Sequence, residues 1–218
     1  MADGSLRVWS RIGLAALSVI VVAIPLSLLR EPKGRAATAL DAPVTFAGTA
    51  SCRDCHGVEH ERWLGSDHDL AMDVATEATV LGDFSGVEAT FHGTTSRFFR
   101  RDGLFYIETE GPDGELAEFE VTPTFGHDPL QQYLTPFPGG RMQAFHLAWD
   151  RIRGEWIHLY PERDIRPGDW LLWTRNGQNW NGMCAECHST NLIKGYVADS
   201  QSYETTWSDI DVGCESCH

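Results

Sequence analysis

The sequence has no cysteine outside one repeated motif, and it is poor in positive charge. All six cysteines fall in Cys-x-x-Cys-His motifs, so none remains for a structural disulfide or a lone nucleophile. Lysine and arginine number 17 against 31 aspartates and glutamates, and the net charge of −14 argues against nucleic acid, whose phosphates would repel the chain. A charged fraction of 22% is typical neither of a disordered chain nor of a polytopic membrane protein.

Long apolar runs are absent too, with one exception at the N-terminus. Residues 12–29 (IGLAALSVIVVAIPLSLL) are almost wholly apolar, and as a helix they would reach about 27 Å, close to the thickness of a bilayer core. The run predicts an export signal or a membrane anchor rather than a buried helix. Residues 37–39 offer a small-x-small cleavage site, but the basic side chains within residues 30–35 disfavour cleavage. We therefore expect residues 1–30 to be an uncleaved transmembrane helix, with the rest outside the cytoplasm.

The Cys-x-x-Cys-His spacing is what covalent attachment of a c-type haem requires. Two cysteines on roughly one helical turn bring both thiols to the neighbouring vinyl groups of the ring, and the histidine that follows reaches the iron. The sequence therefore predicts three covalently attached haems c. The expected attachment residues are Cys52, Cys55, Cys184, Cys187, Cys214 and Cys217, and the expected iron ligands are His56, His188 and His218. The first motif stands apart in the sequence, whereas the second and third form a close pair.

Two other readings of the cysteines remain open. Four of them, at 184–187 and 214–217, have the spacing of a zinc ribbon. A Cys-x-x-Cys pair can also act in thiol–disulfide exchange. Neither reading explains why a histidine follows every pair in a chain with only nine histidines, so haem is the favoured interpretation.

Each iron needs a sixth ligand or keeps that position open. His68 is the first candidate, because it follows the first motif and adjoins the apolar residues 70–71. His158 is the second candidate, in a strand-like segment from which it can point inward or outward. The weaker candidates are His60, His92, His127, His146, Met72, Met142 and Met183, and Met72 is more readily explained as a core residue. The eight tryptophans either wall a porphyrin or pack in an ordinary core.

Between the first and second motifs the residue pattern favours strands. Residues 31–48 read as a linker, and a haem-binding domain is expected over 49–218. A β-rich insertion is expected at about 84–160. β-Branched and aromatic residues separated by turn sequences predict strands at 95–99, 104–109, 116–121, 142–149 and 155–160.

The chain resembles bacterial exported multihaem cytochromes c, in which a haem-binding part often precedes tetratricopeptide repeats. The haem part is similar to the tetrahaem electron-transfer partners of hydroxylamine oxidoreductase. The segments that carry the resemblance are 124–133, 138–141, 149–150, 158–161, 184–191 and 207–218. It implies closely stacked haems, bis-histidine ligation of many irons, and a distal ligand at His68 in Trp63-x-x-Ser66-x-His68. Members of that family continue beyond the position of His218, so we expect a C-terminally truncated fragment.

Together these observations predict an α+β fold. We expect a multihaem cytochrome c with short helices and loops around stacked haems, an antiparallel β-rich insertion and an N-terminal transmembrane helix. The expected function is electron transfer on the periplasmic side of the bacterial inner membrane, with redox partner proteins that dock through basic surfaces. The alternative is a haem-based redox enzyme that acts on a small nitrogen or sulfur compound at an open iron. No catalytic signature favours it.

Overall fold

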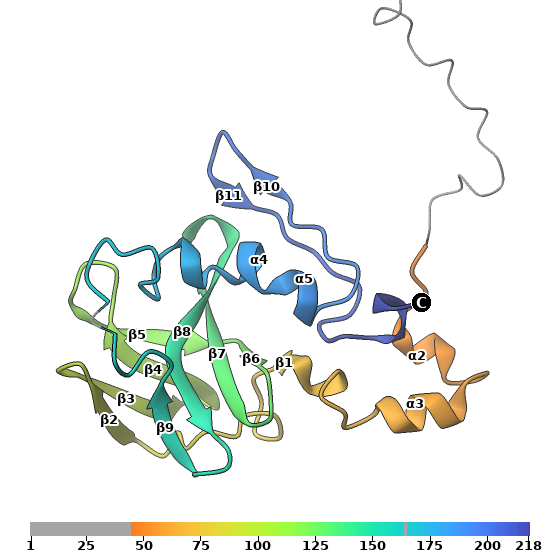
Figure 1. Ribbon diagram of the computed structural model, residues 1–218, viewed down its shortest axis with the longest axis horizontal. Helices are drawn as coiled ribbons and strands as arrows, with labels where there is room; N and C mark the ends of the chain where they lie inside the picture. Colours follow the sequence, from red (N-terminus) through yellow and green to blue (C-terminus); the bar gives the residue numbers. More distant parts are fainter. Residues whose placement is uncertain (1–44, 164) are drawn as a thin grey trace, which may run out of the picture. The chain divides into compact units, whose positions relative to one another are not determined.

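Antiparallel strands account for most of the regular structure in the computed structural model, which describes residues 45–163 and 165–218 (Figure 1). One sheet has the order β1-β6-β7-β8-β9 and a second the order β2-β3-β4-β5, while β10 and β11 pair alone. The first sheet comprises β1 (Met72–Val74), β6 (Pro123–Phe125), β7 (Leu130–Phe137), β8 (Arg141–Asp150) and β9 (Glu155–His158). The others are β2 (Val87–Phe91), β3 (Thr94–Arg101), β4 (Leu104–Glu110), β5 (Leu116–Val121), β10 (Tyr196–Val197) and β11 (Ser202–Tyr203).

The helices of the described residues are short. The α-helices are α2 (Thr49–Cys52), α3 (Gly57–Trp63), α4 (Trp180–Met183) and α5 (Ala185–His188). The 3-10 turns are η2 (Asp69–Ala71), η3 (Pro138–Gly140), η4 (Asn176–Gln178) and η5 (Cys214–Ser216). Isolated helices of this length do not form in water, so tertiary contacts must hold them.

Local sequence explains the four-stranded sheet. In β4, buried residues alternate with exposed or partly exposed ones, and Phe105, Ile107 and Thr109 all face the core. The turns His92-Gly93 and Asp102-Gly103 have positive φ at both residues, at 52° and 84° and at 53° and 81°. Two such residues form the tight turn whose twist matches that of antiparallel strands.

Aromatic side chains fill the space between the two larger sheets. Phe98 of β3 stacks on Trp156 of β9 with 3.6 Å between ring centroids, which joins one sheet to the other. Phe84 makes edge contacts with four of the surrounding rings, those of Phe98, Phe105, Tyr133 and Trp156. Trp173 also belongs to this core and Trp180 to a smaller one, so these tryptophans are packing residues.

The predicted α+β class is wrong. The fold is β-rich, with few helices, and the strands form the main architecture rather than an insertion into a helical cytochrome. The predicted strands at 95–99, 104–109, 116–121, 142–149 and 155–160 are present as β3, β4, β5, β8 and β9. The error came from the strands that were not expected, above all β2 and β7. The Pro- and Gly-rich residues 135–140 predict a loop, whereas β7 extends to Phe137, with Gln131 and Tyr133 buried.

The predicted transmembrane helix at 1–30 lies outside the described residues. Over residues 45–163 and 165–218, no helix is both long and apolar enough to cross a membrane. The apolar run at 12–29 and most of the expected linker at 31–48 lie outside the described residues.

Candidate functional site

Each Cys-x-x-Cys-His motif folds into a tight turn. In every motif the first cysteine is half-buried and the second is exposed, and all six thiols are free. In each motif the N–H of the second cysteine donates to the carbonyl of the first, from Cys55 to Cys52 (3.3 Å), from Cys187 to Cys184 (3.1 Å) and from Cys217 to Cys214 (3.4 Å). The turn that haem attachment requires is thus present in all three motifs.

The first and third motifs lie together on one cavity of about 600 Å³, a size typical of small-molecule sites. The cavity is lined by Cys52, His56, Trp63, His68, Cys214, Cys217 and His218, with Glu59, Val212, Gly213 and Glu215. The fold thus brings the first motif, which stands apart in the sequence, next to the third.

Main-chain contacts hold this pairing in place. The indole Nε1 of Trp63 donates to the carbonyl of Val212 at 3.0 Å, and the N–H of Val212 donates to the carbonyl of His68 at 3.1 Å. Residues 63–68 after the first motif are thereby joined to the residue two positions before Cys214. His68 reaches the cavity because of this contact.

The second motif packs against the five-stranded sheet. Ala185 is fully buried in a cluster with Met72 and Leu134, and the ring of His188 lies 4.4 Å from that of Phe125 in β6. The Nδ1 atom of His188 is buried and has no hydrogen-bond partner in the described part of the chain. Burial lowers the pKa of His188, and a hydrogen bond to the main chain of Ala71 opposes the shift.

These side chains fit haem better than zinc or thiol chemistry. Within residues 45–163 and 165–218, no three His, Cys, Asp or Glu side chains are grouped so that they could hold a metal ion, whereas a haem brings four nitrogens of its own. A half-buried imidazole with a buried, unpartnered Nδ1, as at His188, suits an iron ligand. Burial raises the pKa of the Cys184 thiol, the opposite of what a reactive redox thiol requires.

Residues 173–218 match the family model of cytochrome c554 and c-prime. The matched segment contains the second and third motifs. At the level of the class, the match supports a c-type cytochrome that binds haem covalently and transfers electrons. No curated protein and no solved structure matches the chain significantly.

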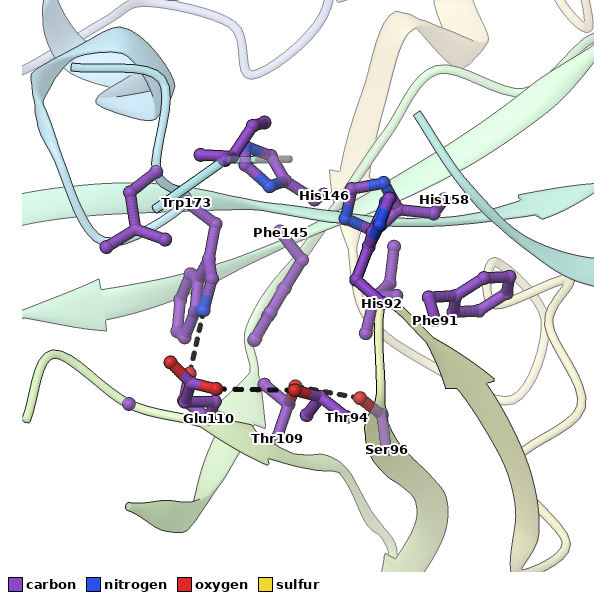
Figure 2. A pocket seen from close by; sticks show the side chains of 14 residues that line it. Phe91, His92, Thr94, Ser96, Thr109, Glu110, Phe145, His146, His158 and Trp173 are labelled. Atoms are coloured by element: carbon purple, nitrogen blue, oxygen red, sulfur yellow. Dashed lines mark hydrogen bonds between the residues drawn. The ribbon is translucent and has the colours of Figure 1, made fainter. Parts of the chain in front are cut away.

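His158, the other predicted ligand, lies in a different cavity, shown in Figure 2. It faces His92 and His146, with 4.7 Å and 5.2 Å between ring centroids, and no residue of the three motifs lines this cavity. The three histidines come from the turn after β2, from β8 and from β9. From the sequence, each of the three is a separate candidate iron ligand, and nothing predicts that they form a cluster.

The ring nitrogens of this histidine cluster are held by main-chain groups. His92 Nε2 lies 3.0 Å from the carbonyl of Tyr160, and His146 Nε2 lies 2.6 Å from that of Leu171, so both nitrogens donate. His158 Nδ1 accepts from the N–H of Tyr160 at 3.1 Å. Burial, and secondly the electrostatic effect of His158, lowers the pKa of His146 to about 4. Burial, and secondly the electrostatic effect of His92, also lowers the pKa of His158.

The remaining candidates are scattered. Met72 is buried in the core, as its apolar surroundings suggested, whereas Met183 is exposed and Met142 is partly buried beside the smaller core. His60 is on α3, with its ring 5.5 Å from that of Trp63, and His127 lies between β6 and β7.

No pattern in the sequence points to the residues that connect the motifs. Thr49, Thr190 and Asp209 form hydrogen bonds between segments that are far apart in the chain, and Glu215 accepts from the N–H groups of Ala47 (3.0 Å) and Gly48 (2.7 Å). Single polar residues at such separations have no spacing pattern, so only a structure can find them.

Proposed function

We propose that the protein is a multihaem c-type cytochrome with three covalently attached haems, and that it transfers electrons outside the cytoplasm. The observation that carries this proposal is the same closed turn in three Cys-x-x-Cys-His motifs, two of which line one cavity. The cysteine pairs of the motifs would form the thioethers, and His56, His188 and His218 would bind the irons. Haem supplies reversible one-electron chemistry at its iron.

His68 is the residue that we propose as a sixth ligand. It lines the cavity of the first and third motifs, and its main chain is fixed by the hydrogen bond from Val212. An iron with two histidine ligands has no position for substrate, which suits electron transfer. The histidine cluster of Figure 2 lies in a cavity without motif residues, so no specific observation favours the enzyme alternative.

The charge of the chain supports a proposal about its partners. With 31 acidic against 17 basic residues, the protein would dock redox partners through their basic surfaces. Covalent haem attachment of this type is a chemistry of exported proteins, which supports a location on the periplasmic side of the bacterial inner membrane.

The test of the function uses the purified holoprotein. It is reduced, exposed to carbon monoxide or nitrite, and then reoxidised, with the haem absorption spectrum recorded at each step. We expect reversible reduction and reoxidation, and no spectral change with either small molecule. A high-spin haem that binds carbon monoxide in the wild-type protein would contradict pure electron transfer.

A further inference from the structure

We propose that the hydroxyls of Thr49 and Thr190 are positioning groups that set the three haem motifs relative to one another, and that they meet at Gly213. This inference rests on the proposed function, because it concerns how the haems would be placed. It adds residues outside the Cys-x-x-Cys-His motifs to the site. We call Thr49, Thr190, Asp209 and Gly213 the motif clamp.

Thr49 connects the first motif to the third. It opens helix α2, which contains Cys52, and it is 5% exposed. Its Oγ1 donates to Asp209 Oδ2 at 3.0 Å and accepts from the N–H of Cys214 at 3.0 Å, and its own N–H also donates to Asp209 at 3.2 Å. The first cysteine of one motif is thus held near the first cysteine of the other by a single hydroxyl.

Thr190 connects the second motif to the third. It follows His188 closely in the sequence and is 0% exposed. Its Oγ1 accepts from the N–H of Gly213 at 2.8 Å, donates to the carbonyl of Asp211 at 2.8 Å and lies 2.8 Å from Ser216 Oγ. Its main chain pairs with Asp209 and with the N–H of Ser208, at 3.0 Å and 2.9 Å. A buried hydroxyl with this many partners fixes its surroundings closely.

Gly213 is the point where the clamp closes. A Cβ at this position would overlap Thr49 Oγ1, and it would lie 2.8 Å from Asp209 Oδ2 and 3.2 Å from Thr190 Oγ1. The backbone at Gly213 is extended, so the requirement for glycine is one of space. Residues next to each of the three motifs therefore meet at one crowded point.

The clamp matters because regular secondary structure does not position these motifs. Helix α2 has 4 residues and η5 has 3, so neither is rigid by itself. The placement of the first and third motifs therefore depends on hydrogen bonds, and those of the clamp act together with the contacts of Trp63, Val212 and Glu215 described above. The potential of a haem responds to nearby charge, hydrogen bonding and solvent exposure. Loss of a clamp hydroxyl should then change haem potentials as well as stability.

The experiment compares redox titrations and thermal unfolding of the holoprotein across matched variants. Thr49→Val and Thr190→Val remove the hydroxyl at nearly constant volume, whereas Thr49→Ser and Thr190→Ser keep it. Thr109→Val is the control, because Thr109 in β4 is 6% exposed and forms a buried hydroxyl pair with Ser96 at 2.7 Å, with no contact to a motif. Thr49→Ala replaces Thr49→Val if that variant does not accumulate.

We expect all folded variants to carry the wild-type number of haems. The valine variants of the clamp should shift at least one midpoint potential, the serine variants should restore it, and Thr109→Val should lower the unfolding temperature without moving any potential. Clamp variants with wild-type potentials, or with shifts no larger than that of Thr109→Val, would overturn the inference. A wild-type protein without covalent haem would instead overturn the proposed function.

Discussion

His68 lies on the cavity wall beside the first and third motifs, and this position leads to a prediction about one iron. If His68 is a sixth ligand, His68→Ala removes it and leaves an open coordination position. We expect the reduced variant to bind carbon monoxide and to show a changed haem spectrum, while the wild-type protein does not. His60→Ala is the control, because His60 stands on the neighbouring helix α3 outside that cavity. If neither reduced variant binds carbon monoxide, His68 is not a sixth ligand of a haem iron.

The crowding around Gly213 leads to a second prediction about a single residue. Gly213→Ala forces a methyl group against Thr49 and Asp209, and overpacking of this kind costs about 1–3 kcal/mol. The loss should appear as a lower free energy of unfolding in denaturant titrations of the holoprotein. At Gly57, a Cβ meets nothing within 4 Å, so Gly57→Ala should change stability by less than about 0.5 kcal/mol. Equal effects at the two glycines would show that the clamp is not crowded.

The residues of the motifs could be predicted from sequence, and the clamp could not. Cysteine, cysteine and histidine act within one turn, so their spacing alone reports the chemistry. Thr49 and Thr190 act through partners more than twenty positions away, at Asp209 and Gly213, and a lone threonine predicts nothing. The distal ligand is intermediate, because His68 is close to its motif in sequence but its cavity also needs the third motif.

At the scale of elements, the histidine cluster joins the tip of the β2–β3 hairpin to strands β8 and β9. His146 has its pKa lowered from 6.5 to about 4, first by burial and then by His158. Since the unfolded chain takes up the proton first, stability is complete above pH 6.5 and is lost as the pH falls toward 4. Among acidic groups, Asp169 opposes the shift, and Glu110 lies on the cavity wall.

The corresponding prediction compares His146→Gln with the wild-type protein. A glutamine cannot take up the proton, so the variant should lose less stability than the wild type between pH 8 and pH 5, by up to about 2 kcal/mol. Urea unfolding at both pH values measures the difference. His60→Gln should follow the wild-type profile, because His60 lies on the short helix α3, away from the cluster. A His146→Gln profile parallel to that of the wild type would contradict the assignment.

Strand prediction succeeded where turn chemistry was explicit. Asp102-Gly103 and the Gly111–Gly114 turn delimited β3, β4 and β5. Strand β2 was missed because His92-Gly93 is a less familiar form of the same two-residue turn. Strand β7 was missed because its glutamines are buried for a reason that only the fold provides: Gln131 bonds Tyr133 and the main chain near Thr79.

For the whole molecule, the dominant physical quantity is the net charge of −14. Electron transfer to a soluble c-type cytochrome of positive net charge should slow steeply with salt, because the Debye length falls from about 30 Å at 0.01 M to about 3 Å at 1 M. Stopped-flow second-order rate constants measure this effect. An acidic acceptor of similar potential is the control, and its rate should rise or stay constant. A rate constant with the basic acceptor that does not change with salt would contradict the proposal that redox partners dock through basic surfaces.

The fold class of the whole molecule could be predicted from the sequence only in part. The motifs favoured an α+β fold with short helices around the haems, but each motif needs only one turn of chain, and that turn can be attached to sheets. The second motif does so through Ala185 and His188 against β6 and its neighbours. The sequence therefore predicted the motifs and five of the strands, but not that the strands form the main architecture around the motifs.

The number of covalently attached haems, proposed to be three, is measured by the intact mass of the purified holoprotein. The mass is measured by electrospray before and after acid–acetone extraction, with an absorption spectrum of the same sample. We predict a mass increase equal to three haems that survives extraction. An increase of two haems or fewer, or a mass that returns to that of the bare polypeptide, would contradict the account.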